Sequence, residues 1–373
     1  MRIVLSGGGT AGHIYPALTV AERLRADGHE VHFVGAPGGP EAGLAREAGL
    51  AFHALPARGF DRSRPASLVG AAGVLAVSTI RAIALLGRLR PGAVAGFGGY
   101  VSLPVGLAAS VRRIPLILHE QNSVPGVANR VLARFACAIG VTYAETGARL
   151  GRSRRTEVTG NPVRDAIVSA DRIEARRQMD LSDDDVLLLA FGGSRGARHL
   201  NETLVALAPR ICARPWVRVV HVAGAAEYES VRSAADADTL TAAERERYHV
   251  VSYLDDMGQV LAAADVVVAR AGATSIAEIT AVGRAAVLVP YPYATGDHQT
   301  KNAEDVAKAG GAIVIADSDL DAPVFEAALL SLLDDAEARE SMARASRGLG
   351  RVDAADRFAA LVRECASPAR TGA

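Results

Sequence analysis

The chain has 373 residues, of which 50% are hydrophobic and 22% charged, so it has enough apolar material for folded domains and does not resemble a disordered protein. Its formal net charge is zero, but residues 1–163 contain 18 arginines and 9 acidic residues, whereas the remainder contains 23 basic and 32 acidic residues. A basic first half favours an anionic partner, such as lipid headgroups or a pyrophosphate. Nucleic acid is not expected as a partner, because no zinc-finger, RNP-type or basic-helix pattern is present.

The cysteines and the apolar segments indicate the cellular compartment that we expect for the protein. Cys137, Cys212 and Cys365 are far apart and form no CxxC pair, which argues against a disulfide framework or a structural zinc site and fits a reducing cytoplasm. The N-terminus runs directly from a short apolar stretch into glycines and lacks the apolar core of a signal peptide. The apolar segments 67–80 and 91–111 are too short or too rich in glycine and proline to span a membrane. We therefore expect a soluble or peripheral protein.

The first half of the chain alternates short apolar runs, glycine-containing loops and amphipathic stretches. This is the pattern of strand–loop–helix units, which form a parallel sheet with helices on both faces. Strands are expected at 3–5, 31–34, 93–96, 115–118 and 138–142, and helices near 16–26 and 41–49.

The pattern restarts after residues 160–163. A helical stretch at 165–179 precedes strands expected at 186–191, 217–223, 249–251, 265–269, 285–290 and 312–316. Residues 234–248 are polar and are expected to form a surface excursion, and 336–364 are helical in composition. We predict an α/β protein with two doubly wound, Rossmann-like domains, 1–163 and 164–344, facing each other across a cleft. A helix at about 345–366 is expected to pack back on the first domain.

A glycine loop, Gly7-Gly8-Gly9-Thr10-Ala11-Gly12-His13, follows the first expected strand. Glycines let the backbone approach a phosphate, and the N-terminus of the next helix favours negative charge. The spacing also matches a dinucleotide-binding fingerprint, but the second strand lacks the following ribose-binding acid, since the next acidic residue is Glu41. His13 is a candidate proton acceptor; the alternative is a histidine that bonds only backbone or phosphate.

A second glycine loop, Gly192–Ala197, repeats this design in the second half. Its Ser194 and backbone amides are candidates to hold a phosphate, and the alternative is a tight turn that needs glycine for its geometry alone. One such loop in each half favours two phosphate-bearing ligands.

Further candidate binding groups follow later strands of the second half. Glu278 lies beyond the strand at 265–269, where it would bind a ribose diol or form a capping box with Ser275. Arg270 would meet a phosphate or form a structural ion pair. The polar loop that contains Gln299 suits sugar hydroxyls, or is an ordinary loop with a helix cap.

Polar residues also follow two strands of the first half. His119-Glu120-Gln121-Asn122 ends one of them and is not expected in the core, with Glu120 as a candidate base or acceptor contact. Gly98-Gly99-Tyr100 ends the preceding strand and would meet the same ligand. Neither a metal nor another cofactor is expected, because Asp236-Ala-Asp238 lies in the polar excursion and Asp317-Ser-Asp319 is typical of a helix cap.

Together, in order and spacing, these motifs resemble the MurG family of N-acetylglucosamine transferases, in glycosyltransferase family 28. The motifs are Gly7–His13, Gly98–Ser102, His119–Asn122, Gly160–Arg164, Gly192–Ala197, Arg270–Glu278 and His298–Asn302, with Ala11 standing where many relatives have glycine. The resemblance implies a GT-B fold and inverting transfer of GlcNAc from UDP-GlcNAc to the C4 hydroxyl of the muramyl sugar of undecaprenyl-pyrophosphoryl-MurNAc-pentapeptide. This converts lipid I to lipid II in peptidoglycan synthesis.

The resemblance also implies a role for each matching residue. The second domain would bind most of the donor, with backbone contacts from Leu254 to uracil and the Glu278 carboxylate on the ribose. Residues matched to UDP-GlcNAc binding are Thr10, Gly12, Asn122, Arg164, Ser194, Leu254, Arg270, Ala273, Glu278 and Gln299. Residues matched to the acceptor pyrophosphate are Gly8, Gly9, Gly98, Gly99 and Tyr100. The catalytic base would be His13, with Glu120 as the second candidate.

A peripheral position at the cytoplasmic face of the bacterial plasma membrane is likewise implied, with cell-wall synthesis proteins as further partners. The segment 75–90, where three arginines lie among apolar residues, would supply part of an anionic-membrane surface; the alternative is a core helix with solvated arginines. Rival functions are a UDP-sugar 2-epimerase of the same fold, an oxidoreductase, which the missing ribose acid disfavours, and a non-catalytic binding scaffold.

Overall fold

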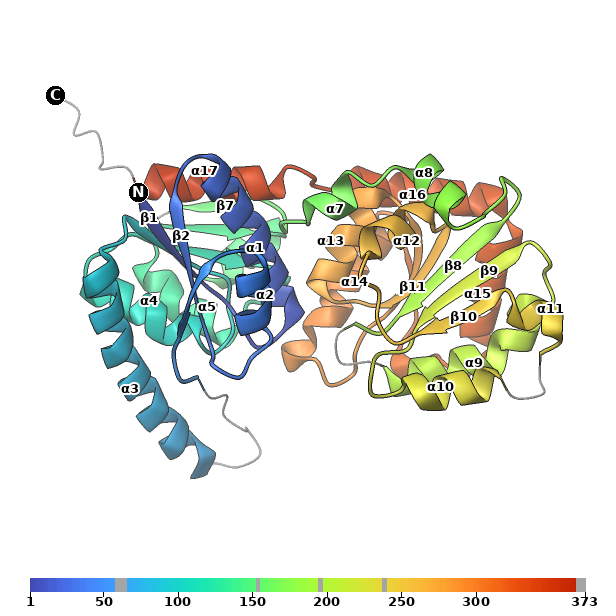
Figure 1. The fold of residues 1–373 in the computed structure, drawn as a ribbon, viewed down its shortest axis with the longest axis horizontal. Coiled ribbons are helices and arrows are strands. Elements are labelled where there is room, and N and C mark those ends of the chain that lie inside the picture. Colours follow the sequence, from blue (N-terminus) through green and yellow to red (C-terminus); the bar gives the residue numbers. More distant parts are fainter. Residues whose placement is uncertain (58–65, 152–154, 194–196, 237–239, 367–373) are drawn as a thin grey trace. The chain divides into compact units, whose positions relative to one another are not determined.

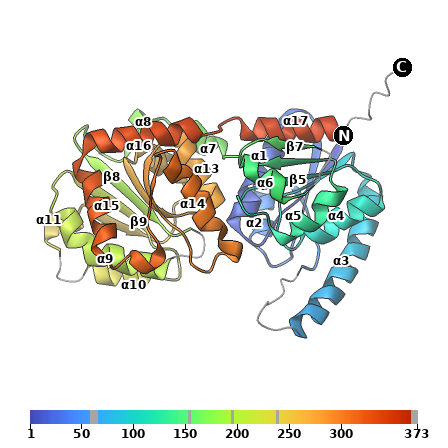
Figure 2. The same cartoon turned by 180° about the vertical axis from the view of Figure 1, so that it is seen from behind.

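The computed structural model describes residues 1–57, 66–151, 155–193, 197–236 and 240–366. Contacts within the chain define two compact units: residues 1–163 with 351–373, and residues 164–350. Each unit is built on a parallel sheet with helices on both faces (Figures 1 and 2), which confirms the expected α/β fold class.

The first unit contains a seven-stranded sheet in the order β3-β2-β1-β4-β5-β6-β7. Its strands are β1 (Arg2–Ser6), β2 (Glu30–Gly35), β3 (Ala51–Ala54), β4 (Ala93–Gly96), β5 (Leu116–Glu120), β6 (Ala138–Val141) and β7 (Thr156–Val158). Its helices are α1 (Ala11–Ala26), α2 (Glu41–Glu47), α3 (Ala66–Leu89), α4 (Ser102–Val111), α5 (Val127–Leu132), η1 (Ala133–Phe135), α6 (Ala144–Arg149) and α17 (Ala354–Ala366).

The strand order of this sheet reverses beside β1. The chain runs from β1 outward to β3, then returns to the other side of β1 and continues from β4 to β7. Because β1 and β4 pair in parallel, with Ser6 opposite Gly96, the loops that follow them leave the same edge of the sheet in opposite directions. Such a reversal is where open α/β sheets bind ligands.

The last helix, α17, belongs to the first unit and packs against α1 and the central strands (Figure 1). Phe358 and Val362 are fully buried in one core with Ile3 and Ile14. At the end of α17 the sulfur of Cys365 lies 2.7 Å from that of Cys137, although both cysteines are free thiols. The helix therefore covers one face of this sheet, although it lies at the other end of the sequence.

Helix α3 covers part of the opposite face, with α4 and α5 (Figure 2). Its second half buries Ala82, Leu85 and Leu86, whereas its first half extends beyond the sheet and exposes apolar side chains. Residues 70–89 are the one stretch of the described chain long and apolar enough to cross a membrane by length and composition, which is weak evidence for a span. The helix continues through Arg81, beyond the end of the apolar segment 67–80.

The second unit contains a six-stranded sheet in the order β10-β9-β8-β11-β12-β13. Its strands are β8 (Val186–Phe191), β9 (Val217–Val222), β10 (Tyr248–Val251), β11 (Val266–Arg270), β12 (Ala285–Val289) and β13 (Ile313–Val314). Its helices are α7 (Asp165–Val168), α8 (Arg172–Gln178), α9 (Arg198–Cys212), α10 (Tyr228–Ala235), α11 (Ala242–Arg245), α12 (Met257–Ala263), α13 (Ala273–Val282), η2 (Thr295–Asp297), α14 (His298–Lys308), η3 (Asp317–Asp319), α15 (Pro323–Asp334) and α16 (Ala336–Leu349).

Here the strand order reverses beside β8. Strands β9 and β10 follow on one side of β8, and β11 to β13 follow on the other. The loops after β8 and β11 therefore diverge from neighbouring strand ends, and each leads into a helix, α9 or α13. The second unit thus repeats the ligand-binding geometry of the first.

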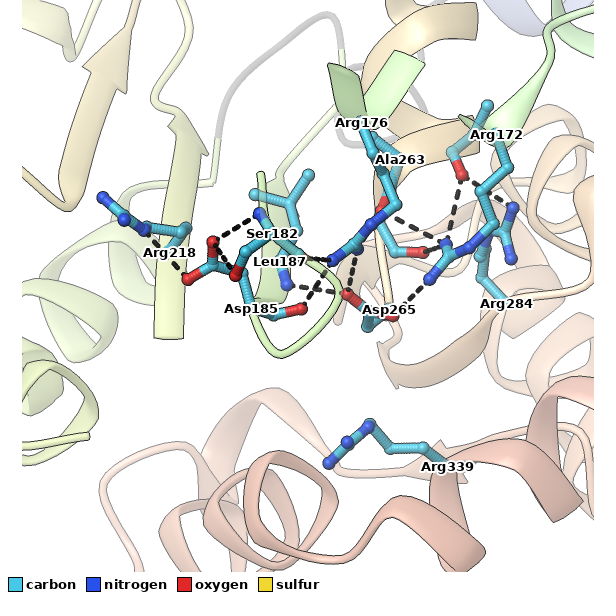
Figure 3. Close-up of polar contacts among 12 residues, drawn as sticks. Arg172, Arg176, Ser182, Asp185, Leu187, Arg218, Ala263, Asp265, Arg284 and Arg339 are labelled. Atoms are coloured by element: carbon cyan, nitrogen blue, oxygen red, sulfur yellow. Dashed lines mark hydrogen bonds and ion pairs between the residues drawn. The ribbon is translucent and has the colours of Figure 1, made fainter. Parts of the chain in front are cut away.

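An ion-pair network fixes the opposite, amino-terminal edge of this sheet (Figure 3). Asp265, just before β11, accepts from Arg172 at 2.6 Å, from Arg176 at 3.0 Å and from the backbone N–H of Leu187 at 2.8 Å. Arg284 lies beside this network and donates to the last carbonyls of α12. Burial, followed by the nearby Arg172, lowers the pKa of Arg284 to about 9. One carboxylate therefore offsets several half-buried guanidinium groups.

Asp265→Asn tests this network, because it keeps the size of the side chain but removes its charge. We expect the free energy of unfolding to fall by about 3 kcal/mol, measured by urea denaturation, since a half-buried cation cluster loses its counterion. Asp334→Asn is the matched control, because Asp334 is largely exposed in its pair with Arg214, and it should cost about 0–1 kcal/mol. Equal losses for the two variants would contradict the role given to Asp265.

Candidate active site

The two glycine loops of the first unit are in direct contact. Gly9, Gly98 and Gly99 all have positive φ angles of 80° to 90°, a conformation that favours glycine. A Cβ atom on Gly99 would lie 2.4 Å from the carbonyl oxygen of Gly8, so only glycine allows this approach of the two backbones. The sequence-predicted residues Gly8, Gly9, Gly98 and Gly99 are therefore brought together at the strand reversal, next to the exposed side chain of Tyr100.

His13 lies in the first turn of α1, half-buried against the second of these loops. A Cβ on Gly98 would lie 3.1 Å from Cε1 of the His13 ring, so the imidazole stacks on this glycine. Thr10 precedes the helix in extended conformation and makes no side-chain cap, and Gly12 lies in the same turn. The structure thus places an imidazole beside backbone groups that suit an anion.

Glu41 is a residue of this region whose role the sequence pattern missed. It is fully buried at the start of α2 and accepts hydrogen bonds from the backbone N–H groups of Ala36 at 2.9 Å and Gly9 at 3.4 Å. A Cβ on Gly8 would lie 2.4 Å from its carboxylate. Glu41 therefore shapes the glycine loop, although in sequence it is only the first acid after the second strand.

The polar segment after β5 is more buried than expected, since His119, Glu120 and Gln121 are at most 1% exposed. The Nε2 of His119 donates to the carbonyl of Gly160 at 2.8 Å. Burial lowers the pKa of His119 to about 4, so the ring is neutral at ordinary pH. Its ring packs between Phe97 and Phe358. The expectation that these residues lie outside the core was wrong, because aromatic side chains from distant segments cover them.

The carboxylate of Glu120 is already saturated with hydrogen-bond donors. It accepts from the backbone N–H of Asn122 at 3.1 Å, the backbone N–H of Gly126 at 2.9 Å and the side chain of Asn129 at 2.8 Å. These contacts hold the turn that carries Asn122, which is half-buried. The geometry therefore fits a positioning role for Glu120 better than proton abstraction.

In the second unit, helices α9 and α13 both begin at the strand reversal. The loop before α9 contains Gly193, with a φ of 80°, and its predicted phosphate ligand Ser194 lies outside the described residues. Helix α13 begins at Ala273, and Gly272 at its cap position makes no side-chain hydrogen bond to it. Two helix N-termini at one sheet edge favour a bound phosphate.

Glu278 lies on α13 and pairs with Arg164. The Nε and Nη2 atoms of Arg164 donate to one carboxylate oxygen of Glu278 at 3.2 and 2.9 Å. Burial raises the pKa of Glu278, and the Arg164 guanidinium opposes that shift. The capping-box alternative is wrong, because the helix begins at Ala273 and its cap position is Gly272, which leaves Ser275 inside the helix.

Arg270 ends β11 and points toward the neighbouring strand, where it donates to the carbonyl of Pro290 at 3.2 Å and pairs with Asp317 at 2.6 Å. Asp317 therefore does not cap a helix, as its sequence position had indicated, because α15 begins only at Pro323 and its cap position is Ala322. The ion-pair alternative for Arg270 is thus present in the structure.

The remaining predicted donor contacts lie in two loops. Gln299 is in the first turn of α14, and its side-chain oxygen accepts from the backbone N–H of Tyr291 at 2.9 Å. Leu254 follows β10, and its backbone N–H and C=O have no hydrogen-bond partner within the described parts of the chain. A residue whose backbone N–H and C=O are both unpaired can donate to and accept from the edge of a nucleobase.

Metal-binding groups are not gathered at either edge. Among the described residues, no three or more His, Cys, Asp and Glu side chains are placed to hold a metal ion. The ligands suggested by the Asp236-Ala-Asp238 spacing fall partly outside these residues.

Comparison with known proteins identifies the class. The chain matches the models of the glycosyltransferase family 28 N-terminal domain over residues 3–141 and C-terminal domain over residues 187–358. The crystal structure of Acinetobacter baumannii MurG has a TM-score of 0.77 and 28% identity and covers 97% of this chain and 99% of its own. A putative UDP-N-acetylglucosamine 2-epimerase from Listeria monocytogenes, 16% identical with a TM-score of 0.67 over 97% of this chain and 96% of its own, shares only the fold. The fold is that of a GT-B glycosyltransferase.

Two curated relatives carry the name UDP-N-acetylglucosamine–N-acetylmuramyl-(pentapeptide) pyrophosphoryl-undecaprenol N-acetylglucosamine transferase. The Desulforudis audaxviator protein is 38% identical over 98% of this chain and 99% of its own length. The Nitratidesulfovibrio vulgaris (strain DP4) protein is 43% identical over 95% and 94%. The chain therefore belongs to glycosyltransferase family 28 and, within it, to the MurG family of N-acetylglucosamine transferases.

Gly99→Ala tests the contact between the two glycine loops, and Gly9→Ala is the matched control. Both positions have positive φ, but a Cβ on Gly9 would meet nothing within 4 Å. We expect the control to lose about 1 kcal/mol of unfolding free energy from backbone strain. Gly99→Ala should lose a further 1–3 kcal/mol, roughly, from the overpacking against Gly8. If chemical denaturation showed the same loss of unfolding free energy for both variants, the close approach of Gly99 to Gly8 would be contradicted.

Proposed function

We propose that the chain transfers GlcNAc from UDP-GlcNAc to the C4 hydroxyl of the muramyl sugar of undecaprenyl-pyrophosphoryl-MurNAc-pentapeptide, converting lipid I to lipid II. One observation carries the proposal: each unit has a glycine loop at the strand reversal of its own sheet, with His13 at one and the Arg164–Glu278 pair near the other. The names of the 36–43% identical relatives agree with this reaction.

The second unit is proposed to bind the donor. The open backbone of Leu254 would bind uracil, and the Glu278 carboxylate would accept from the ribose hydroxyls, exchanging part of its bond with Arg164. Arg270 and the N-terminus of α13 at Ala273 would stabilise the diphosphate, with Ser194 as a further ligand. Gln299 would bind sugar hydroxyls.

The first unit is proposed to bind the acceptor, with the pyrophosphate at Gly8, Gly9, Gly98, Gly99 and Tyr100. Thr10, Gly12 and Asn122 would reach the donor from this unit. Anion binding there rests on backbone N–H groups and the N-terminus of α1, since no basic side chain lies in the glycine loops themselves.

The proposed chemistry is a single inverting displacement. His13 takes the proton of the C4 hydroxyl as the oxygen attacks the anomeric carbon of GlcNAc, and UDP leaves with the bonding electron pair. His13 is favoured as the base over Glu120, because Glu120 already accepts from Asn122, Gly126 and Asn129. Stabilisation of the charge on UDP by preorganised donors would supply much of the rate.

Turnover with and without acceptor tests the assignment. The purified protein is incubated with UDP-GlcNAc in the presence or absence of a lipid I analogue, and UDP and sugars are measured. Release of UDP only with the acceptor supports the transferase. Conversion of GlcNAc to ManNAc without acceptor would identify a 2-epimerase instead, and binding without turnover would identify a scaffold.

His13→Ala tests the base. We expect kcat to fall by about 10²–10⁴-fold, because a positioned general base contributes that much. The affinity for UDP, measured by calorimetry, should stay the same, since UDP is assigned to the second unit. His249→Ala, on an exposed position of β10, is the control and should keep its kcat. Wild-type turnover of His13→Ala would remove His13 as the base.

Helix α3 is proposed to attach the first unit to the cytoplasmic face of an anionic membrane. The helix exposes Val77, at 48%, and Ile80, at 67%, on the same stretch as exposed Arg81 and Arg88. Apolar side chains flanked by arginines are typical of surfaces that rest on anionic lipid. Ala82, Leu85 and Leu86 of the same stretch pack into the core, so the two interpretations of the segment 75–90 apply to different faces of one helix.

Ile80→Asp tests this surface by co-sedimentation with phosphatidylglycerol vesicles. We expect binding to weaken by roughly tenfold or more, because burial of one isoleucine side chain contributes about 1.5–3 kcal/mol. Ile173→Asp, at an 81% exposed position of the second unit, is the matched control and should bind as the wild type does. Equal binding of all three proteins would place the membrane contact elsewhere.

A further inference from the structure

Arg270 is buried, and its contacts hold only part of its guanidinium group. Its side chain is 8% exposed, and its Nη1 lies 2.6 Å from Asp317 and donates to the carbonyl of Pro290. The guanidinium carbon lies 5.8 Å from the centre of the Tyr291 ring. The buried Nε has no hydrogen-bond partner within the described parts of the chain. One donor of this cation therefore has no partner among the described residues.

Asp317 also pairs with His199, in the first turn of α9. The Nδ1 of His199 lies 3.0 Å from Asp317, and its Nε2 lies 3.0 Å from Asp321. The Asp321 carboxylate accepts from Thr203 at 3.3 Å. An unbroken chain of charged groups thus runs from Arg270 through Asp317 and His199 to Asp321, and it joins α9 to the end of β11.

The protonation state of His199 determines how the charge of Asp317 is shared. The hydrogen bonds that His199 makes to Asp317 and then to Asp321 raise the pKa of His199, so its protonated form persists to higher pH than that of an ordinary histidine. While His199 is protonated, Asp317 is shared between two cations. When the proton is lost, Arg270 is the remaining cation on Asp317, and its attraction for a second anion falls.

We propose that His199, acting through Asp317, is a positioning residue that tunes Arg270 for the donor diphosphate, so that the donor binds more tightly while His199 carries its proton. This inference rests on the proposed function, in which Arg270 contacts that diphosphate. His199 itself touches neither the sugar nor the reacting atoms. Its loss should therefore be detected directly as a change in the affinity for UDP.

Other charged groups near His199 are committed elsewhere. Arg198, on the same helix, pairs with Glu227 at 3.0 Å. Glu326 of α15 pairs with Arg210, further along α9. The charges that face His199 are therefore Asp317 and Asp321, with Arg270 beyond Asp317.

His199→Gln and His199→Lys test the proposal, because the first is neutral and the second stays charged at every pH used. The dissociation constant of UDP is measured from about pH 5.5 to 8.5, the range in which a histidine titrates. The phosphate titrates there too, so each variant is compared with the wild type at the same pH. We expect His199→Gln to bind UDP roughly three- to tenfold more weakly at low pH and equally at high pH. His199→Lys should match the wild type at low pH and bind more tightly at high pH.

Uridine and Arg270→Gln separate the possible failures. Uridine has no phosphate, so its affinity should be the same for all variants, which also shows that the site is folded. In an Arg270→Gln background the effect of His199→Gln on UDP should vanish. Suppose that Arg270→Gln weakens UDP binding, but that the dissociation constants of UDP for His199→Gln and for the wild type keep the same ratio at every pH. The inference about His199 is then overturned, while the contact between Arg270 and the phosphate stands. If Arg270→Gln leaves UDP binding unchanged, the Arg270 contact in the proposed function fails, and the inference fails with it.

Discussion

The strand reversal beside β1 and β8 is the constraint on which the rest of each unit depends. Where neighbouring parallel strands send their chains to opposite faces of a sheet, the loops diverge and the following helices present unpaired backbone N–H groups at one edge. In the first unit the two loops come so close that Gly99 has no room for a Cβ beside Gly8. This strand order thus brings two loops so close that glycine is required where they touch. The polar residues of the candidate site lie around these glycines.

The buried strands were predictable, because continuous apolar runs flanked by glycine loops are typical of a parallel sheet. Strands β4 and β8 have the expected bounds. The edge strands β3 and β7 were missed, since they are short, half-exposed and contain His53 and Glu157. A strand defined mainly by its pairing to one neighbour leaves little trace in hydrophobic periodicity. The placement of α17 on the first unit also depends on contacts distant in sequence, such as Phe358 with Phe97.

The candidate site was predictable as a set of residues but not in its internal pairing. The positions after strands pointed to Arg270 and Glu278, and the family resemblance to Arg164, but neither indicated that Arg164 reaches Glu278 or that Arg270 reaches Asp317. Glu120 shows the same limit. Its position after β5 suits a base, and only the fold reveals that backbone amides and Asn129 already saturate it. Hydrogen-bond donors that only the fold places, here from Asn122 to Asn129, decide whether a carboxylate is available for chemistry.

These internal pairs also determine what binding can contribute. A buried charge without a partner would cost several kcal/mol, roughly, so Glu278 and Arg270 need counterions while no ligand is bound. In the proposed function, a ribose at Glu278 or a phosphate at Arg270 would then compete with a counterion that is already in place. The affinity for the donor is therefore the difference between the free energy of the contacts that the ligand makes and that of the internal ion pairs that it weakens. A stronger internal pair lowers the affinity as surely as a weaker ligand contact does. A residue that touches only the counterion, as His199 touches Asp317, thereby acts on the ligand as well.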